Sequence, residues 1–93
     1  MSQYDLRFSH ELGAAEACRR VEGQLASLAR EYALTFANPA VNQYRLYGKG
    51  VDAHVSVADA EVRIGLEMSL LVDMLAGPRI RAALQEKLPS VLA

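Results

Sequence analysis

The sequence predicts an α+β domain in which two helices cover one face of a four-stranded, mostly antiparallel sheet. Two observations lead to this fold class. Four segments alternate apolar and polar residues with the period of half-buried strands, and two segments repeat apolar residues every three or four positions, as amphipathic helices do. Each segment has one apolar face, so two layers suffice to bury them all. The predicted order is β-α-β-β-β-α, in a single domain over residues 1–93.

The chain begins with a strand that is followed by a long helix. Apolar and polar residues alternate in the segment 4–9, which predicts the strand. After Gly13 the apolar residues recur every three or four positions, at Ala17, Val21, Leu25, Leu28 and Tyr32. This spacing predicts an amphipathic helix of about five turns. We expect it to begin near Ser9 or Gly13 and to end by the segment 36–42, where Pro39 and several turn-forming residues occur.

Three more strands are predicted at residues 43–47, 51–57 and 62–68. The short loops between them contain Gly48, Gly50 or Asp59, which is typical of two consecutive hairpins. The polar residues of these strands are expected on the solvent face of the sheet; they are Arg45, Tyr47, Asp52, His54, Ser56, Arg63 and Glu67. A right-handed crossover through the long helix would set the first strand parallel to the second or to a neighbour.

The second helix is predicted to start at Gly77 and Pro78, because a proline in the first turn lacks only an N–H that would be unpaired anyway. Its apolar stripe consists of Ile80, Leu84 and Leu88. We expect Pro89 to disrupt this helix, since proline cannot donate a hydrogen bond within it.

The charge balance argues against a nucleic-acid partner. Ten Lys and Arg residues stand against eleven Asp and Glu residues, the net charge is −1 at pH 7, and both signs are scattered along the chain. We therefore expect no dominant attraction to phosphate backbones or anionic lipid. An RNA-binding module is kept as the least favoured alternative, because the order of elements is also that of double-stranded-RNA-binding-like folds.

The single cysteine, Cys18, excludes an intrachain disulfide and a cysteine-rich zinc site. The first residues contain no apolar signal region, and no run approaches the eighteen apolar residues that a membrane span requires. We therefore expect a cytoplasmic protein without a membrane span.

Three side chains are candidates for chemistry. His10 lies between the first strand and the long helix, without a spacing typical of metal ligands, and is expected to order this junction. His54 lies in one column with Asp52 and Ser56, a trio that is usually a solvated surface. Cys18 has no base nearby and is expected to fill space. We predict no catalytic residues, no metal site and no cofactor, and keep His10 and His54 as possible functional polar residues.

The segment 69–76 carries more apolar residues than a connection needs. Five large apolar residues occupy six positions and are interrupted only by Asp73; they are Leu70, Leu71, Val72, Met74 and Leu75. A helical turn would gather four of them on one side, and strand alternation would also leave some outside. We predict that these five residues form a surface for self-association or docking. The alternative is a tight connection that faces the core.

The order of several motifs resembles the polyhydroxyalkanoic acid system protein family, small bacterial proteins linked to polyester storage. The resemblance lies in "SHELGAAEA" from Ser9, "GVDAHVSV" from Gly50, "VRIGLEM" from Val62, the paired Leu70 and Leu71, and "GPRIRAALQEKL" at the end. It implies an association with polyhydroxyalkanoate metabolism or its granules in an accessory or regulatory role. It supplies no catalytic residues.

Together these observations predict a non-enzymatic accessory protein that acts through self-association, as a dimer or other homo-oligomer, or by docking on a granule or a granule-associated protein. The second hypothesis is a carrier or enzyme that holds a small apolar ligand between the helices and the sheet. Such a site requires a sizeable internal cavity.

Overall fold

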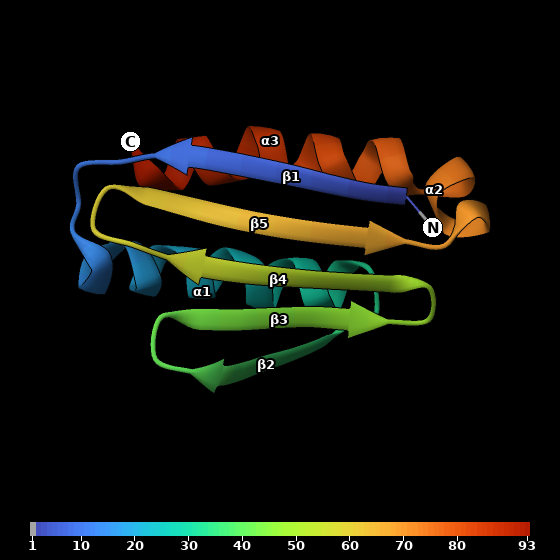
Figure 1. The fold of residues 1–93 in the computed structure, drawn as a ribbon, viewed down its shortest axis with the longest axis horizontal. Helices are drawn as coiled ribbons and strands as arrows, with labels where there is room; N and C mark the ends of the chain where they lie inside the picture. The colour runs from blue at the N-terminus through green and yellow to red at the C-terminus, as the bar shows by residue number, and fades with distance from the viewer. Residues whose placement is uncertain (1) are drawn as a thin grey trace.

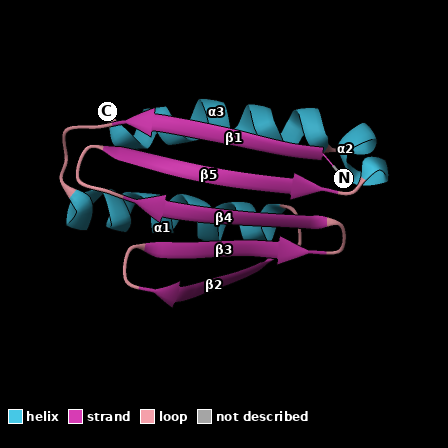
Figure 2. Cartoon of the chain, viewed as in Figure 1, coloured by secondary structure: helices cyan, strands magenta, loops and turns pink. Residues whose placement is uncertain are grey.

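The computed structural model describes residues 2–93 and shows a single sheet with its helices on one face (Figure 1, Figure 2). The elements in chain order are β1 (Ser2–Ser9), α1 (Ala14–Glu31), β2 (Thr35–Ala40), β3 (Gln43–Gly48), β4 (Val51–Val57), β5 (Glu61–Met68), α2 (Leu70–Leu75) and α3 (Gly77–Leu92). The α+β class is as predicted. Residues 2–93 form five strands and three helices, whereas the prediction had four strands and two helices.

The strand that the sequence reading missed is β2. Its sequence, TFANPA, lacks a clear apolar alternation, and Pro39 argued for a turn. A proline is tolerated here because β2 is an edge strand, and its register with β3 shifts between Ala37 and Ala40. Phe36 attaches β2 to the core by stacking on Tyr44, with ring centroids 5.8 Å apart. The helix α1 ends before the segment 36–42, as predicted, but the residues that follow it form a strand of the sheet and not only a turn.

The predicted parallel placement of the first strand is wrong. The strand order is β1-β5-β4-β3-β2 and every neighbouring pair is antiparallel. The reason lies in β2: α1 carries the chain to the far edge of the sheet, and the next three strands return by hairpins. β5 is the last of these strands, and β1 pairs with the edge of β5 that faces away from β4.

The third difference lies at the end of the chain, where α3 continues through Pro89 to Leu92. Pro89 lies in the last turn, so its missing N–H removes a single helical bond. Arg20 of α1 supports this end, because its Nη1 donates to the carbonyl oxygens of Val91 (3.0 Å) and Ala93 (3.1 Å). Leu92 is buried, which stabilises the extra turn further.

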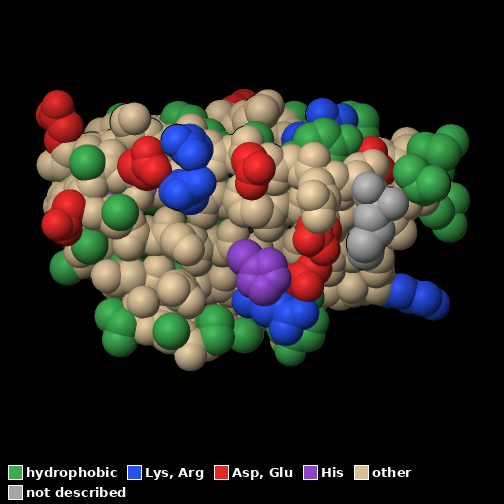
Figure 3. Space-filling view, viewed as in Figure 1, with side chains coloured by type: hydrophobic (Ala, Val, Ile, Leu, Met, Phe, Trp, Pro, Cys, Tyr) green, Lys and Arg blue, Asp and Glu red, His purple; other side chains and the backbone are tan. Residues whose placement is uncertain are grey.

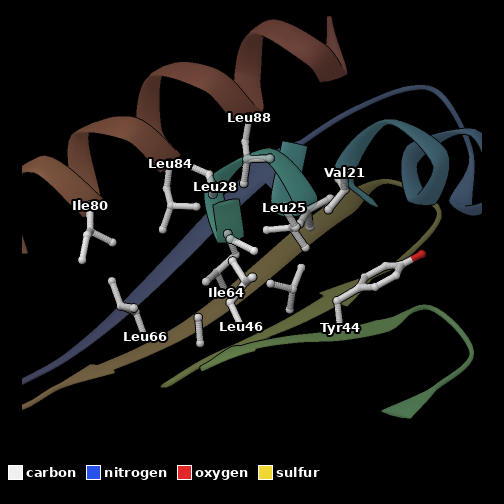
Figure 4. Close-up of a cluster of buried hydrophobic side chains, with 14 of the residues drawn as sticks. Val21, Leu25, Leu28, Tyr44, Leu46, Ile64, Leu66, Ile80, Leu84 and Leu88 are labelled. Carbon is white, nitrogen blue, oxygen red and sulfur yellow. The ribbon is translucent and has the colours of Figure 1, made fainter. Parts of the chain in front are cut away.

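The core lies between the sheet and the two long helices (Figure 4). Its sheet side consists of Tyr44, Leu46, Val51, Ala53, Val55, Val57, Val62, Ile64, Leu66 and Met68. Its helical side consists of Ala17, Val21, Leu25, Leu28 and Ala29 of α1 and Ile80, Leu84, Leu88 and Leu92 of α3. The periodicity of the sequence predicted most of these positions. The opposite face of the sheet carries the polar residues and has no helix over it (Figure 1).

Candidate docking surface

The apolar segment after β5 forms a helix of its own, α2. Ser69 begins it, because its side-chain oxygen accepts the backbone N–H of Val72 at 3.2 Å. The backbone N–H of Ser69 donates to the carbonyl of Gly50 at 2.9 Å, which ties this start to the turn between β3 and β4. At the other end the N–H of Ala76 bonds back to Val72 at 2.7 Å. The six residues are therefore held at both ends.

The inner side of α2 packs through Val72. This residue is half-buried and contacts the core, so it does not lie with the other four apolar residues of the segment. Gly50 makes the contact possible: a Cβ at Gly50 would come within 2.6 Å of Val72 Cγ2 and 2.8 Å of Ser69 Oγ. Gly50 also has a φ of 82°, which favours glycine. The turn and the helix thus depend on each other.

Asp73 fixes α2 to the edge of the sheet. The hydroxyl of Tyr4 on β1 donates to Asp73 Oδ2 at 2.8 Å, and the guanidinium of Arg81 lies 4.3 Å from the centre of the Tyr4 ring. The hydroxyls of Ser2 and Tyr4, with the positive charge of Arg81, lower the pKa of Asp73. Its other oxygen lies against Gly77 at the start of α3. The carboxylate of α2 therefore bonds to β1 through one oxygen and packs against the start of α3 with the other, which has no hydrogen-bond partner among residues 2–93.

This arrangement turns four large apolar side chains outward. The exposed fractions are 66% for Leu70, 67% for Leu71, 79% for Met74 and 73% for Leu75. We call these four residues the α2 patch. They lie at the end of the molecule beyond β5, where α2 projects (Figure 1) and hydrophobic side chains gather on the surface (Figure 3). The sequence predicts all five apolar residues in one surface, and the structure brings four of them together.

His10 is buried and bonds with two separate stretches of backbone. Its Nδ1 accepts the N–H of Leu12 at 3.2 Å, and its Nε2 lies 3.0 Å from the carbonyl oxygen of Ala58. The first bond requires Nδ1 without a proton, so Nε2–H is the donor in the second. His10 thus joins the β1–α1 connection to the β4–β5 turn, which leaves its ring nitrogens no capacity for a ligand.

His54 lies exposed on the open face of the sheet. Its Nε2 is 3.3 Å from Asp52 Oδ1, and Asp52 is also held by Arg45 through two bonds of 2.9 and 2.8 Å. Arg45, with a smaller contribution from His54, lowers the pKa of Asp52. The carboxylate stays ionised and bound to the guanidinium, so it is not arranged to accept a proton from a substrate.

Cys18 is half-buried in α1, and its thiol lies 3.1 Å from Asn42 Oδ1. Burial, with smaller contributions from the Cys18 thiol and from Glu22, raises the pKa of the adjacent Tyr44 hydroxyl, which donates to Glu22 at 3.3 Å. No basic nitrogen is among these partners. The thiol therefore links α1 to the β2–β3 turn.

A comparison with models of known protein families identifies the family of the chain. A family model described as "Putative polyhydroxyalkanoic acid system protein" matches residues 5–92, which includes the α2 patch, β1 from Asp5 onward and the whole of β2, β3, β4 and β5. The chain belongs to this family. Comparisons with curated proteins and with solved structures found no match.

The interior of this family member is closely packed. Between α1, α3 and the sheet there is an apolar space of about 20 Å³, lined by residues such as Leu28, Leu46 and Leu84. A water molecule needs about 10–15 Å³ on the same measure and ligand sites have roughly 300 Å³ or more, so an apolar ligand does not fit between these described elements.

Within residues 2–93 of this family member, no three His, Cys, Asp or Glu side chains are grouped so that they could hold a metal ion. None of the helices in the same range is both long and apolar enough to span a membrane.

Proposed function

We propose that the protein is a non-enzymatic accessory protein of polyhydroxyalkanoate storage that attaches to an apolar surface, that of the polyester granule, through the α2 patch. The observation that carries this proposal is the exposure of Leu70, Leu71, Met74 and Leu75 on one side of a six-residue helix. Family membership supplies the setting. The single cysteine and the polyester setting both support a cytoplasmic location.

The patch is built to stay outside the core. Val72 and Asp73 hold the inner side of α2 by packing and by the bond to Tyr4, so rotation of α2 to bury the leucines would break both contacts. Burial of the four exposed side chains by a partner would contribute roughly 4–8 kcal/mol, from about 1.5–3 kcal/mol for a fully buried side chain of this size and their exposed fractions. Such a contribution is large for so short a segment.

The small extent of the patch favours a soft apolar surface over a second copy of the chain. A stable protein interface buries about 800 Å² on each partner, or some 20 residues. Four side chains at one end of the molecule are fewer than that, whereas an apolar phase can close around a projecting helix without a complementary shape. Dimerisation through two α2 patches is the alternative, and Met74 would be an adaptable contact in it.

The test compares two variants that each lose exposed apolar surface. Leu71→Ser with Met74→Ser removes half of the patch, which should weaken recovery on isolated polyester granules by roughly 30- to 700-fold, or about 2–4 kcal/mol. Val41→Ser is the matched control, since Val41 is 87% exposed in the β2–β3 turn, outside the patch. Circular dichroism should be unchanged in both variants.

Equal recovery of both variants would contradict the proposal. Mass measurement in solution separates the alternative: a parent dimer that becomes monomeric only in the double variant, without any granule binding, would establish self-association instead. Loss of the folded state in the double variant would show that the patch belongs to the core.

A further inference from the structure

The open face of the sheet is hollowed where β1, β5 and β4 lie side by side. Gly65 occupies the middle of this face, paired with Asp5 on one side and with His54 on the other. Because Gly65 has no side chain, a depression of about 260 Å³ remains above it, bordered also by Arg7, Arg63 and Ser56. The nearest atom to a Cβ built at Gly65 is Asp5 Oδ1, at 4.0 Å, so the space is empty of protein.

Two arginines stand next to each other at one end of this hollow. Arg7 of β1 and Arg63 of β5 are directly paired in the register and lie on the same face. Like charges opposite each other destabilise a sheet, so this pair is unfavourable unless something negative lies between or above them. Blue side chains lie adjacent on this face in Figure 3.

The protein itself does little to neutralise this pair. Arg63 reaches only a partly exposed Glu61, at 3.8 Å, and Arg7 forms no ion pair or side-chain hydrogen bond with residues 2–93. On the same face Arg45 is paired with Asp52 through two short bonds, and its guanidinium lies 4.4 Å from the centre of the Tyr47 ring. Among the described residues, the other two arginines of this face, Arg7 and Arg63, thus lack such a close carboxylate partner.

We propose that the hollow binds a small molecule through an oxyanion, a phosphate or carboxylate group, held by Arg7 and Arg63. A guanidinium presents paired N–H donors that match two oxygens of such a group, and two neighbouring guanidiniums can hold it from both sides. Ser56 is the register partner of Arg63 and supplies a hydroxyl on the β4 side. The body of the molecule lies over Gly65, where Asp5 accepts a hydrogen bond from a hydroxyl and His54 closes the far side.

The shape of the hollow limits the ligand. Its volume is slightly below the lower end of typical ligand sites, roughly 300 Å³, and it is open to solvent. Charges at such a surface are screened, so we expect weak binding, in the millimolar range. The site lies on the face of the sheet away from the helices, and it is therefore independent of the α2 patch and of granule attachment.

The test is a titration of the full chain with inorganic phosphate, and separately with acetate, followed by amide NMR at constant ionic strength with chloride as the reference. Saturable shifts should centre on Arg7, Arg63 and Gly65. Arg63→Gln should raise the phosphate dissociation constant at least about tenfold, because it removes one charged pair of bonds. Arg79→Gln, an exposed arginine at the start of α3, should leave it unchanged.

A second variant tests the hollow without changing any charge. Gly65→Val places a side chain in the space; its Cβ has no neighbour closer than 4.0 Å and valine suits a strand, so the fold should persist while phosphate binding is lost. Shifts that grow linearly without saturation, or that are the same in Arg63→Gln and Gly65→Val as in the parent, would overturn the proposal. Saturation by phosphate but not acetate would identify a phosphate site, and saturation by both a general oxyanion site.

Discussion

Replacement of Gly77 by alanine should destabilise the fold, although helix propensity alone predicts the opposite effect. It begins α3, where replacement of glycine by alanine normally stabilises a helix by up to about 1 kcal/mol. Here a Cβ would fall on Asp73 Oδ1, with Asp73 Cγ at 3.1 Å. The carboxylate would have to leave Tyr4, and a hydrogen bond to a charged group is worth about 1.5–3 kcal/mol. We expect Gly77→Ala to lower the free energy of unfolding by about 1–2 kcal/mol.

The assay is urea unfolding followed by circular dichroism, with thermal unfolding as a second measurement. A loss of 1 kcal/mol in a domain of this size lowers Tm by about 4–8 °C. The same substitution in an Asp73→Ala background provides the control, because the obstructing carboxylate is then gone. There Gly77→Ala should be neutral or stabilising. The difference between the two backgrounds measures the coupling between residues 73 and 77.

Stabilisation of the parent protein by Gly77→Ala would refute this reasoning. It would mean that the Asp73 side chain moves aside without cost, and that the junction of β1, α2 and α3 is not fixed by this carboxylate. The orientation of the α2 patch would then lose its main support.

Two further predictions concern acid and the end of α3. Arg19 and Arg20 lower the pKa of Glu16 from 4.5 to about 2, and the pKa values of Asp52 and Asp73 are also lowered. A carboxyl group whose pKa is lowered in the folded state stabilises the fold at pH values above its ordinary pKa, and this stabilisation is lost as the pH falls toward the lowered pKa. The urea midpoint should therefore fall as the pH drops from 4.5 toward 2, and it should fall less steeply in Glu16→Gln. A midpoint that stays constant over this pH range would contradict the assignment. Arg20→Gln should lower the free energy of unfolding by about 1 kcal/mol and speed amide hydrogen exchange in the last turn of α3, because the carbonyls of Val91 and Ala93 lose their donor. Unchanged exchange in this turn would show that the donor is dispensable.

Regular alternation made most of the sheet predictable. β4 and β5 each place four apolar residues on one face, and the alternation is unbroken along both strands. β2 was not predicted, because an edge strand needs little apolar surface and tolerates a proline such as Pro39. Its sequence is therefore typical of a turn. The missing strand also made the predicted topology wrong. Without β2, the strand after α1 was predicted to lie beside β1 or near it, in parallel orientation.

The α2 patch was partly predictable, and its support was not. The excess of apolar residues was visible in the sequence, and helical spacing already grouped the four that the structure exposes. The inward direction of Asp73 depends on Tyr4, 69 positions away, and that of Val72 on the missing side chain of Gly50. No local pattern reports such contacts. Gly65 is different, because a glycine within an alternating strand is a local sign of an open space beside it.

The central claim, that the α2 patch is covered when the protein is attached, can be tested most directly by the oxidation of methionines by peroxide with and without polyester granules. Met74 is 79% exposed, whereas Met68 is fully buried in the core and serves as the internal control. The account predicts that Met74 oxidises rapidly in the free protein and several-fold more slowly on granules, with Met68 slow in both. Equal oxidation of Met74 in the free and the granule-bound protein would contradict it.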